Sequence, residues 1–155
     1  MIFTPPLVVF TSRYNCPTLA TADLVAVSIS RWPPRFPLAY PLRVALYDLA
    51  PTPGLLRLVR ERGWHELFAD AYTRHLDALG AAEVVRQLRC AQGDGRAICL
   101  LCFEDVRSPE RSCHRRLLAR WLERETGLDV QELPDDSPTA RPKRSKPDPR
   151  QLPLS

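Results

Sequence analysis

The stretch of sequence that decides the fold is Ala97-Ile98-Cys99-Leu100-Leu101-Cys102-Phe103-Glu104, which is apolar over most of its length. Such a run is typical of a central parallel strand covered on both faces, and it is too short to predict a helix. A polar loop follows, and Ser112-Cys113-His114-Arg115-Arg116 then opens an amphipathic segment. Many α/β proteins bind ligands where a buried strand leads through a loop to a helix start.

The segments on either side predict the rest of the domain. Apolar runs rich in β-branched residues predict strands near residues 7–10, 24–30, 42–49 and 129–133. Apolar residues three and four positions apart predict helices near residues 52–63, 64–79 and 81–90, and another ending at Gly127. The alternation of strands and helices predicts a single α/β domain, residues 1–133, with a mostly parallel, Rossmann-like sheet flanked by helices.

The composition changes after Leu133, where proline and charged residues replace most of the apolar ones. Such a segment cannot bury enough apolar surface to offset the entropy lost on ordering, so residues 134–155 are predicted to form a disordered tail. Its basic residues could contact nucleic-acid phosphates, although charge runs are usually just solvated. These residues are Arg141, Lys143, Arg144 and Lys146.

Charge and cysteine content restrict the class of protein. The 155 residues carry a net charge of +4, and Lys143 and Lys146 are the only lysines. Arginine suits the recognition of phosphate or carboxylate groups, because its planar guanidinium donates two parallel hydrogen bonds. The odd count of five cysteines favours reduced thiols in a cytoplasm. We expect a cytoplasmic protein, because no basic leader and no membrane-length apolar run is found.

Several motifs resemble a known bacterial family. Cys102-Phe103-Glu104, then Ser112-Cys113-His114-Arg115, then Val130-Gln131-Glu132-Leu133 resemble the signature of domain-of-unknown-function family 488. Upstream, Ser28-Ile29-Ser30-Arg31 with Pro33-Pro34 and Leu49-Ala50-Pro51 agree with it, so the similarity covers roughly residues 24–133. The resemblance implies an α/β domain in which the Glu of the strand and the Cys-His-Arg triplet lie close together. It implies no particular reaction.

The candidate catalytic residues are Cys113, His114 and Glu104. If Ser112 is the N-cap, Cys113 is the first helical residue, where the helix dipole and neighbouring cations favour its thiolate. A cap at Ser108 would move Cys113 into the second turn, and a purely structural Cys113 needs no chemistry at all. Glu104, directly after the strand, is the general acid or base candidate, with a salt bridge to Arg115 or capping of the next helix as the alternatives.

Other cysteine chemistries fit the spacing poorly. A phosphatase loop needs an arginine six residues after the nucleophile, where this chain has Ala119. Cys99 and Cys102 lie on opposite faces of a strand, which does not suit a redox pair. The same geometry disfavours a zinc site of Cys99, Cys102, Cys113 and His114, so no metal and no cofactor is expected.

Together these patterns predict a site at the carboxyl edge of the sheet. Arg31, Arg115 and Arg13 are the candidate anion-binding residues, since parallel strands would carry them to the same edge. The predicted function is binding of an anionic small molecule such as a nucleotide, with a cysteine-dependent hydrolase or transferase as its enzymatic form. The alternative is a non-catalytic module that associates with nucleic acid or protein.

Overall fold

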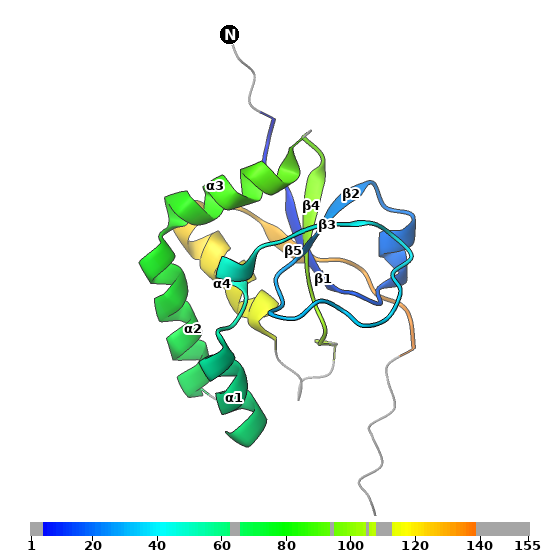
Figure 1. The fold of residues 1–155 in the computed structure, drawn as a ribbon. Coiled ribbons are helices and arrows are strands. Elements are labelled where there is room, and N and C mark those ends of the chain that lie inside the picture. The colour runs from blue at the N-terminus through cyan, green and yellow to red at the C-terminus, as the bar shows by residue number, and fades with distance from the viewer. Residues whose placement is uncertain (1–4, 63–65, 94, 105, 108–112, 139–155) are drawn as a thin grey trace, which may run out of the picture.

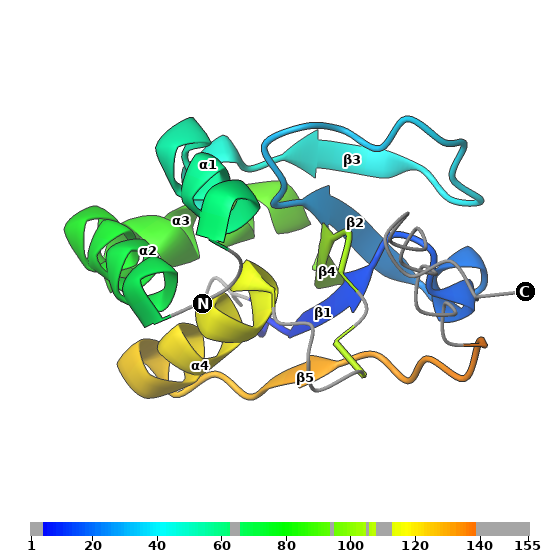
Figure 2. The same ribbon diagram turned by 90° about the horizontal axis from the view of Figure 1, so that it is seen from below.

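The sheet consists of five strands, and every pair of neighbours runs in parallel. The computed structural model describes residues 5–62, 66–93, 95–104, 106–107 and 113–138. The strand order is β3-β2-β4-β1-β5 (Figure 2). The bounds are β1 Val9–Arg13, β2 Leu24–Ser28, β3 Leu42–Ala45, β4 Ala97–Cys102 and β5 Val130–Glu132.

Strand β4 is the centre of the sheet, as its apolar run predicts. It pairs with β1 on one side and β2 on the other, so that Ile98 lies between Val9 and Val25. Its side chains alternate between two separate apolar clusters: Ile98 and Leu100 belong to one, and Cys99 and Leu101 to the other. A strand buried on both faces has little room for polar residues, which explains the unbroken apolar run.

The four α-helices within the described ranges lie over the same face of the sheet (Figures 1 and 2). They bury one continuous apolar cluster against the strands, to which Phe68, Leu88 and Trp121 contribute. The hydroxyl of the buried Tyr72 donates to the carbonyl of Leu49 at 2.6 Å, so this polar atom is satisfied in the core. The bounds are α1 Pro53–Arg62, α2 Glu66–Leu79, α3 Ala81–Gln92 and α4 His114–Thr126.

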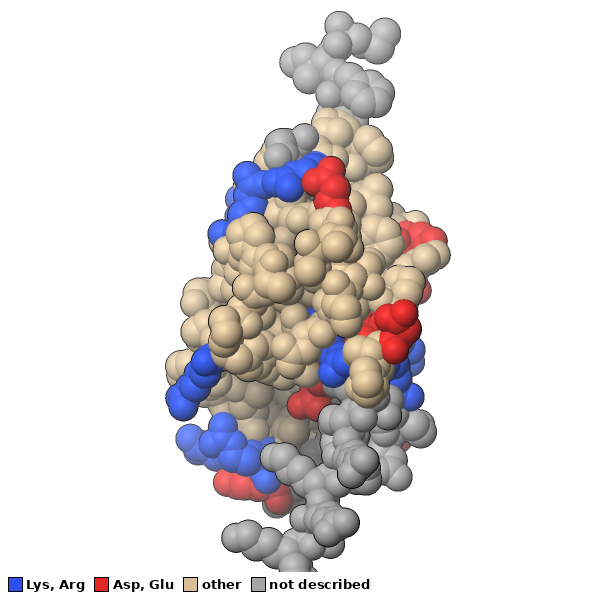
Figure 3. Space-filling model, turned by 90° about the vertical axis from the view of Figure 1, so that its right-hand side faces the viewer, with Lys and Arg blue, Asp and Glu red and all other residues tan. Residues whose placement is uncertain are grey.

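None of the α-helices in the described part of the chain covers the second face of the sheet. A short 3₁₀ segment, Pro17–Ala20, and the long connection between β2 and β3 lie over it (Figure 2). Its smaller cluster contains Tyr14, Leu19, Leu101 and Leu133. Seen from this side, the middle of the surface carries few charged side chains (Figure 3). The helices thus sit on one side only, and loops close the other.

Three hydroxyl groups are buried together on this second face. The Tyr14 hydroxyl lies 2.6 Å from Ser28 Oγ and 2.5 Å from Ser30 Oγ. Ser30 Oγ also donates to the carbonyl of Trp32 at 3.0 Å. These bonds satisfy three polar groups and hold the chain that leaves β2.

Several predicted boundaries need correction. Helix α4 begins at His114, and Cys113 is its N-cap with an extended backbone (φ −136°, ψ 150°). The expectation that Cys113 is helical, with Ser112 or Ser108 as the cap, is therefore wrong.

The third strand ends at Ala45, and a 3₁₀ turn over Tyr47–Leu49 replaces its predicted second half. Thr52 caps the start of α1, since its Oγ1 accepts from the Leu55 amide at 3.2 Å.

The chain after β5 folds back to the end of β1. Asp135 accepts a hydrogen bond from Arg13 Nε at 2.6 Å. Partial burial opposes the charged form of Asp135, but hydrogen bonds from Arg13 and Ser137 outweigh it and lower the pKa of this carboxyl. The rest of the predicted tail, with all four of its basic candidates, lies outside the described residues. No helix in the described ranges is long and apolar enough to cross a membrane.

Candidate functional site

A cavity of about 150 Å³ lies at the carboxyl edge of the sheet, between the ends of β2 and β4. The starts of α1 and α4 complete its wall. This is the edge at which parallel α/β proteins bind ligands, because loops and helix N-termini converge there. The lining residues are Ser30, Arg31, Trp32, Pro51, Leu56, Cys102, Phe103, Glu104, Cys113 and His114.

Two buried cysteines meet at this cavity. Cys102 is the last residue of β4, Cys113 caps α4, and their Sγ atoms are bonded. The expectation that all cysteines are reduced thiols is therefore wrong for this pair. The two Cα atoms are 7.6 Å apart, beyond the usual range of about 4.4–6.8 Å for disulfides. Cys99 lies on the opposite face of the strand and takes no part.

His114 is buried beside the two sulfurs. One ring nitrogen, Nε2, lies 2.6 Å from the carbonyl oxygen of Ile29, and the other, Nδ1, lies 3.4 Å from Cys113 Sγ. Because a carbonyl oxygen only accepts, Nε2 donates, and Nδ1 of the neutral ring turns a lone pair toward the sulfur. Burial, helped by the nearby charge of Arg115, lowers the pKa of His114 to about 4 against the opposing effect of the Ile29 hydrogen bond. The ring is therefore neutral at pH 7.

Arg115 is buried and bound to protein groups. Its Nη2 and Nε donate to the carboxylate of Glu132 at 2.7 and 3.0 Å. Its Nη1 donates to Cys102 Sγ at 3.0 Å and to the carbonyl of Glu104 at 2.6 Å. The guanidinium thus connects the ends of β4 and β5 and places a positive charge next to the Cys102 sulfur.

Arg31 lies in the cavity wall with its guanidinium held in place. Nε donates to the carbonyl of Pro51 at 3.1 Å and Nη2 to that of Tyr47 at 3.3 Å. The group also lies over the Tyr47 ring, 5.8 Å from its centroid. No carboxylate among the described residues is within ion-pair distance of Arg31, so none of them neutralises its charge.

The structure brings together four of the six predicted site residues. Arg31, Glu104, Cys113 and His114 all line the cavity, and the Glu104 residue is exposed. Arg115 lies behind Cys102 and is paired with Glu132, so the alternative salt bridge from Arg115 to the Glu104 side chain is not formed. Arg13 is at the same sheet edge, but it pairs with Asp135 and does not line the cavity.

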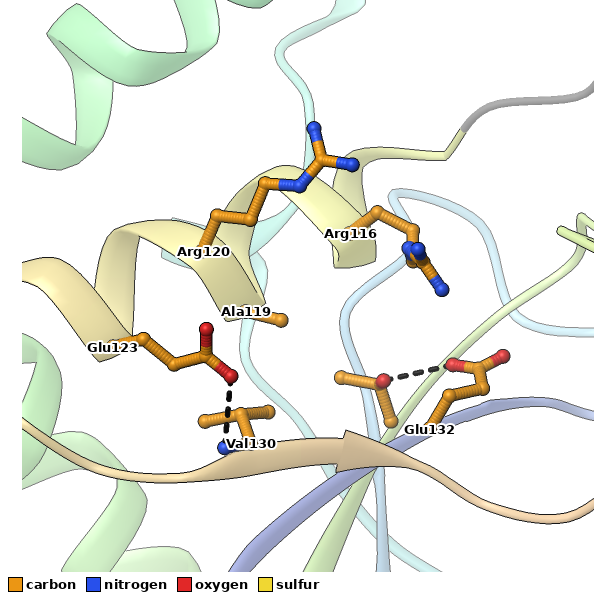
Figure 4. A pocket seen from close by; sticks show the side chains of 7 residues that line it. Arg116, Ala119, Arg120, Glu123, Val130 and Glu132 are labelled. Atoms are coloured by element: carbon orange, nitrogen blue, oxygen red, sulfur yellow. Dashed lines mark hydrogen bonds between the residues drawn. The ribbon is translucent and has the colours of Figure 1, made fainter. Parts of the chain in front are cut away.

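A second hollow, of about 200 Å³, lies between α4 and β5 (Figure 4). Arg116 and Arg120, one helical turn apart, stand over it from α4. Two carboxylates share the hollow: Glu123 accepts from the Val130 amide at 3.2 Å, and Glu132 accepts from Thr11 Oγ1 at 2.7 Å. This hollow therefore carries two cationic and two anionic side chains.

Sequence reasoning missed several residues of the cavity. Cys102 was not among the predicted site residues, and its partner Cys113 lies eleven residues further along the chain. Trp32, which is 62% exposed in the cavity wall, was not singled out either. The same holds for Glu132, which does not line the cavity but binds Arg115 behind it. The Cys-Phe-Glu and Cys-His-Arg motifs together were the signal that could have paired the two cysteines.

The geometry defines a parallel α/β protein with a cysteine–histidine cavity at the carboxyl edge of its central strands. A family described as the active DUF488-N3 subclade, DUF488-N3a, matches residues 9–126. The chain belongs to this family, which confirms the resemblance seen in its motifs. Comparisons with curated proteins and with solved structures found no match.

Proposed function

We propose that the protein binds a small anionic molecule of nucleotide type in the cavity between β2 and β4. The observation that carries this proposal is the Arg31 guanidinium, which is positioned by two carbonyl groups and has no acidic partner among the described residues. A charge held in this way is preorganised for a phosphate or carboxylate, because little side-chain entropy is lost on binding.

The rest of the wall suits a planar, partly apolar group. Trp32, Pro51, Leu56 and Phe103 supply apolar surface, and the exposed indole of Trp32 offers a face for stacking. Pockets for drug-sized ligands usually measure about 300–1,000 Å³. A cavity of about 150 Å³ therefore encloses one part of such a ligand while the remainder lies over the exposed rim.

Calorimetric titration with AMP, ADP and ribose 5-phosphate tests this proposal. Arg31→Ala should weaken binding about 10- to 100-fold, the effect of losing one charge-assisted hydrogen bond. Arg35→Ala is the matched control, because Arg35 is an exposed arginine of the same connection and does not line the cavity. Equal affinity in the wild type and Arg31→Ala, or no binding of any of the three compounds, would refute the proposal.

A second candidate function is a reaction at the Cys113 thiol. The observation that favours it is the lone pair of His114 Nδ1, 3.4 Å from Cys113 Sγ, which can take the thiol proton once the sulfurs are reduced. Glu104 would then act as the proton carrier at the rim. The description of the subclade as active is in keeping with such chemistry.

Alkylation by iodoacetamide, mapped to each cysteine by mass spectrometry in the reduced, metal-free protein, tests this candidate. Cys113 should react faster than the exposed Cys90, and His114→Gln should remove that advantage. Cys90 serves as the internal control, since it lies away from His114 on α3. A Cys113 that reacts no faster than the buried Cys99 would exclude the nucleophile.

A further inference from the structure

We propose that Cys102, Cys113 and His114 together bind one thiophilic divalent cation, of which zinc is the simplest case. Their ligand atoms all lie within 4.8 Å of one another, and all three residues are buried. They are the only such group of three found among the described residues. Two cysteines, one histidine and a fourth open position form a known type of zinc site in enzymes.

The histidine has the orientation that a metal ligand needs. Nε2 donates to the carbonyl oxygen of Ile29, which leaves Nδ1 as the atom turned toward the sulfurs. Histidines that bind metals usually donate their other ring N–H to a carbonyl or carboxylate, because this bond fixes the ring and the tautomer. The Ile29 carbonyl, at the end of β2, supplies that support.

The cysteine at the end of β4 has a matching support. Arg115 Nη1 donates to Cys102 Sγ at 3.0 Å from a guanidinium that Glu132 holds in place. A cationic donor beside a sulfur stabilises the thiolate, which is the form that binds metal. One ligand on β4, Cys102, and one ligand on α4, His114, thus each have a hydrogen bond to a group outside the proposed ligand set.

The backbone separation of the cysteines also fits a shared metal. Their Cα atoms are 7.6 Å apart, whereas disulfides usually keep these atoms within about 6.8 Å. Zinc–sulfur bonds of about 2.3 Å let two thiolates stand further apart than a direct sulfur bond does. Binding requires the pair to be reduced by a dithiol or phosphine, and the two thiol protons are released to solvent as the cation enters.

The cavity gives the fourth position a function. Cys102, Cys113 and His114 all line it, so a cation bound to them would face the space assigned above to an anionic ligand. In this respect the inference rests on the proposed ligand site. With the cation bound, Cys113 is a ligand and no longer a free nucleophile, and an oxygen of the small molecule would take the open position.

Cobalt titration of the full chain, reduced with tris(carboxyethyl)phosphine and kept free of oxygen, tests the proposal. We expect one Co²⁺ per chain, with the near-ultraviolet charge-transfer absorption of cobalt–thiolate bonds, and displacement of cobalt by Zn²⁺. Cys102→Ser and Cys113→Ser should each lose stoichiometric binding and most of this absorption. Cys90→Ser is the control, because this cysteine is exposed on α3 and should leave both unchanged.

A second measurement does not depend on the variants being folded. Zn²⁺ should protect Cys102 and Cys113 of the wild-type protein from N-ethylmaleimide, as mapped by mass spectrometry, and leave Cys90 reactive. The proposal is overturned if the reduced wild-type protein binds no cobalt, if absorption persists in both serine variants, or if zinc protects neither cysteine.

The two proposals fail separately. Cobalt binding is measured without any organic ligand, and nucleotide binding is measured in the presence of EDTA. Loss of cobalt binding together with intact, Arg31-dependent nucleotide binding would remove the metal and leave the ligand site. The opposite result would leave a metal site with no evidence for an anionic ligand.

Discussion

Cys99 and Cys102 are three residues apart on the same strand, yet their surroundings are opposites. Cys99 is fully buried in the smaller apolar cluster, and burial, reinforced by the charge of Glu132, raises the pKa of its thiol. Cys102 is equally buried but contacts the Arg115 guanidinium, the Cys113 sulfur and the cavity. Cys99 is therefore a packed core residue, whereas Cys102 lies beside a cation, a second sulfur and the cavity.

The difference shows that position along β4 decides the role of each sulfur. Cys99 lies in the middle of the strand, where both faces are covered by apolar side chains. Cys102 is the last residue of the strand, where loops and the start of α4 bring polar groups together. The carboxyl end of a parallel strand can hold charged partners that its centre excludes.

The largest expected effect on stability comes from replacing Glu132, the carboxylate that pairs with the Arg115 guanidinium beside Cys102. Glu132→Leu leaves the Arg115 guanidinium, with a 1% exposed side chain, without its ionic partner. The free energy of unfolding should fall by about 3–5 kcal/mol, as for other broken buried pairs. Urea denaturation measures this loss.

Glu125→Leu is the matched control for that variant. Glu125 pairs with Arg124 on the surface of α4, and exposed pairs of this kind contribute little. A loss for Glu132→Leu as small as that for Glu125→Leu would show that the region around Cys102 does not depend on a balanced charge.

The next effect is the acid sensitivity of the buried histidine in the same region. The pKa of His114 is about 4 in the folded chain and 6.5 in the unfolded one, so the unfolded state takes up its proton first. The contribution of neutral His114 to the free energy of unfolding is complete above pH 6.5. It falls by about 3 kcal/mol as the pH of the metal-free protein is lowered to 4. Urea denaturation at a series of pH values measures it.

His114→Gln provides the comparison, because glutamine keeps a donor for the Ile29 carbonyl but does not titrate. Between pH 6.5 and 4, the free energy of unfolding of the wild type should fall by about 3 kcal/mol more than that of His114→Gln. Parallel pH profiles for the two proteins would contradict the buried, neutral state of the ring.

The smallest effect is expected on the apolar side of β4. Cys99→Ser should lower the free energy of unfolding by about 1–3 kcal/mol, because a hydroxyl replaces a sulfur where an apolar environment surrounds it. Cys90→Ser, at an exposed position, should change it by no more than about 0.5 kcal/mol. A neutral Cys99→Ser would mean that this side of the strand is more polar than its neighbours indicate.

The period of the apolar residues explains why the fold was predictable. Ile98 to Leu101 predicts a strand covered on both faces, and the stripe that includes Phe68, Tyr72 and Leu76 predicts a core-facing helix. These are local patterns, each set by one element. The coverage of the second face by loops was not predictable, since loops rich in proline carry no such period.

The site was predicted as a place more successfully than as a set of contacts. The strand order brings Arg31, Cys113 and His114 to one cavity, as their positions after strands and at a helix start indicated. The pairing of Arg115 with Glu132 and of Cys102 with Cys113 depends on how β4, α4 and β5 dock. Side-chain contacts between elements that are far apart in the sequence produce no periodic pattern of apolar residues, so they could not be predicted from it.

The three buried hydroxyls on the second face have a directional consequence. Each hydroxyl has a single proton, and Ser30 gives its proton to the carbonyl of Trp32. Ser30 must therefore accept, and the two shorter contacts give the order: Ser28 donates to Tyr14, and Tyr14 donates to Ser30. Because Ser30 and Trp32 both line the cavity, these directed bonds tie the packing of the loop-covered face to one wall of the cavity at the sheet edge.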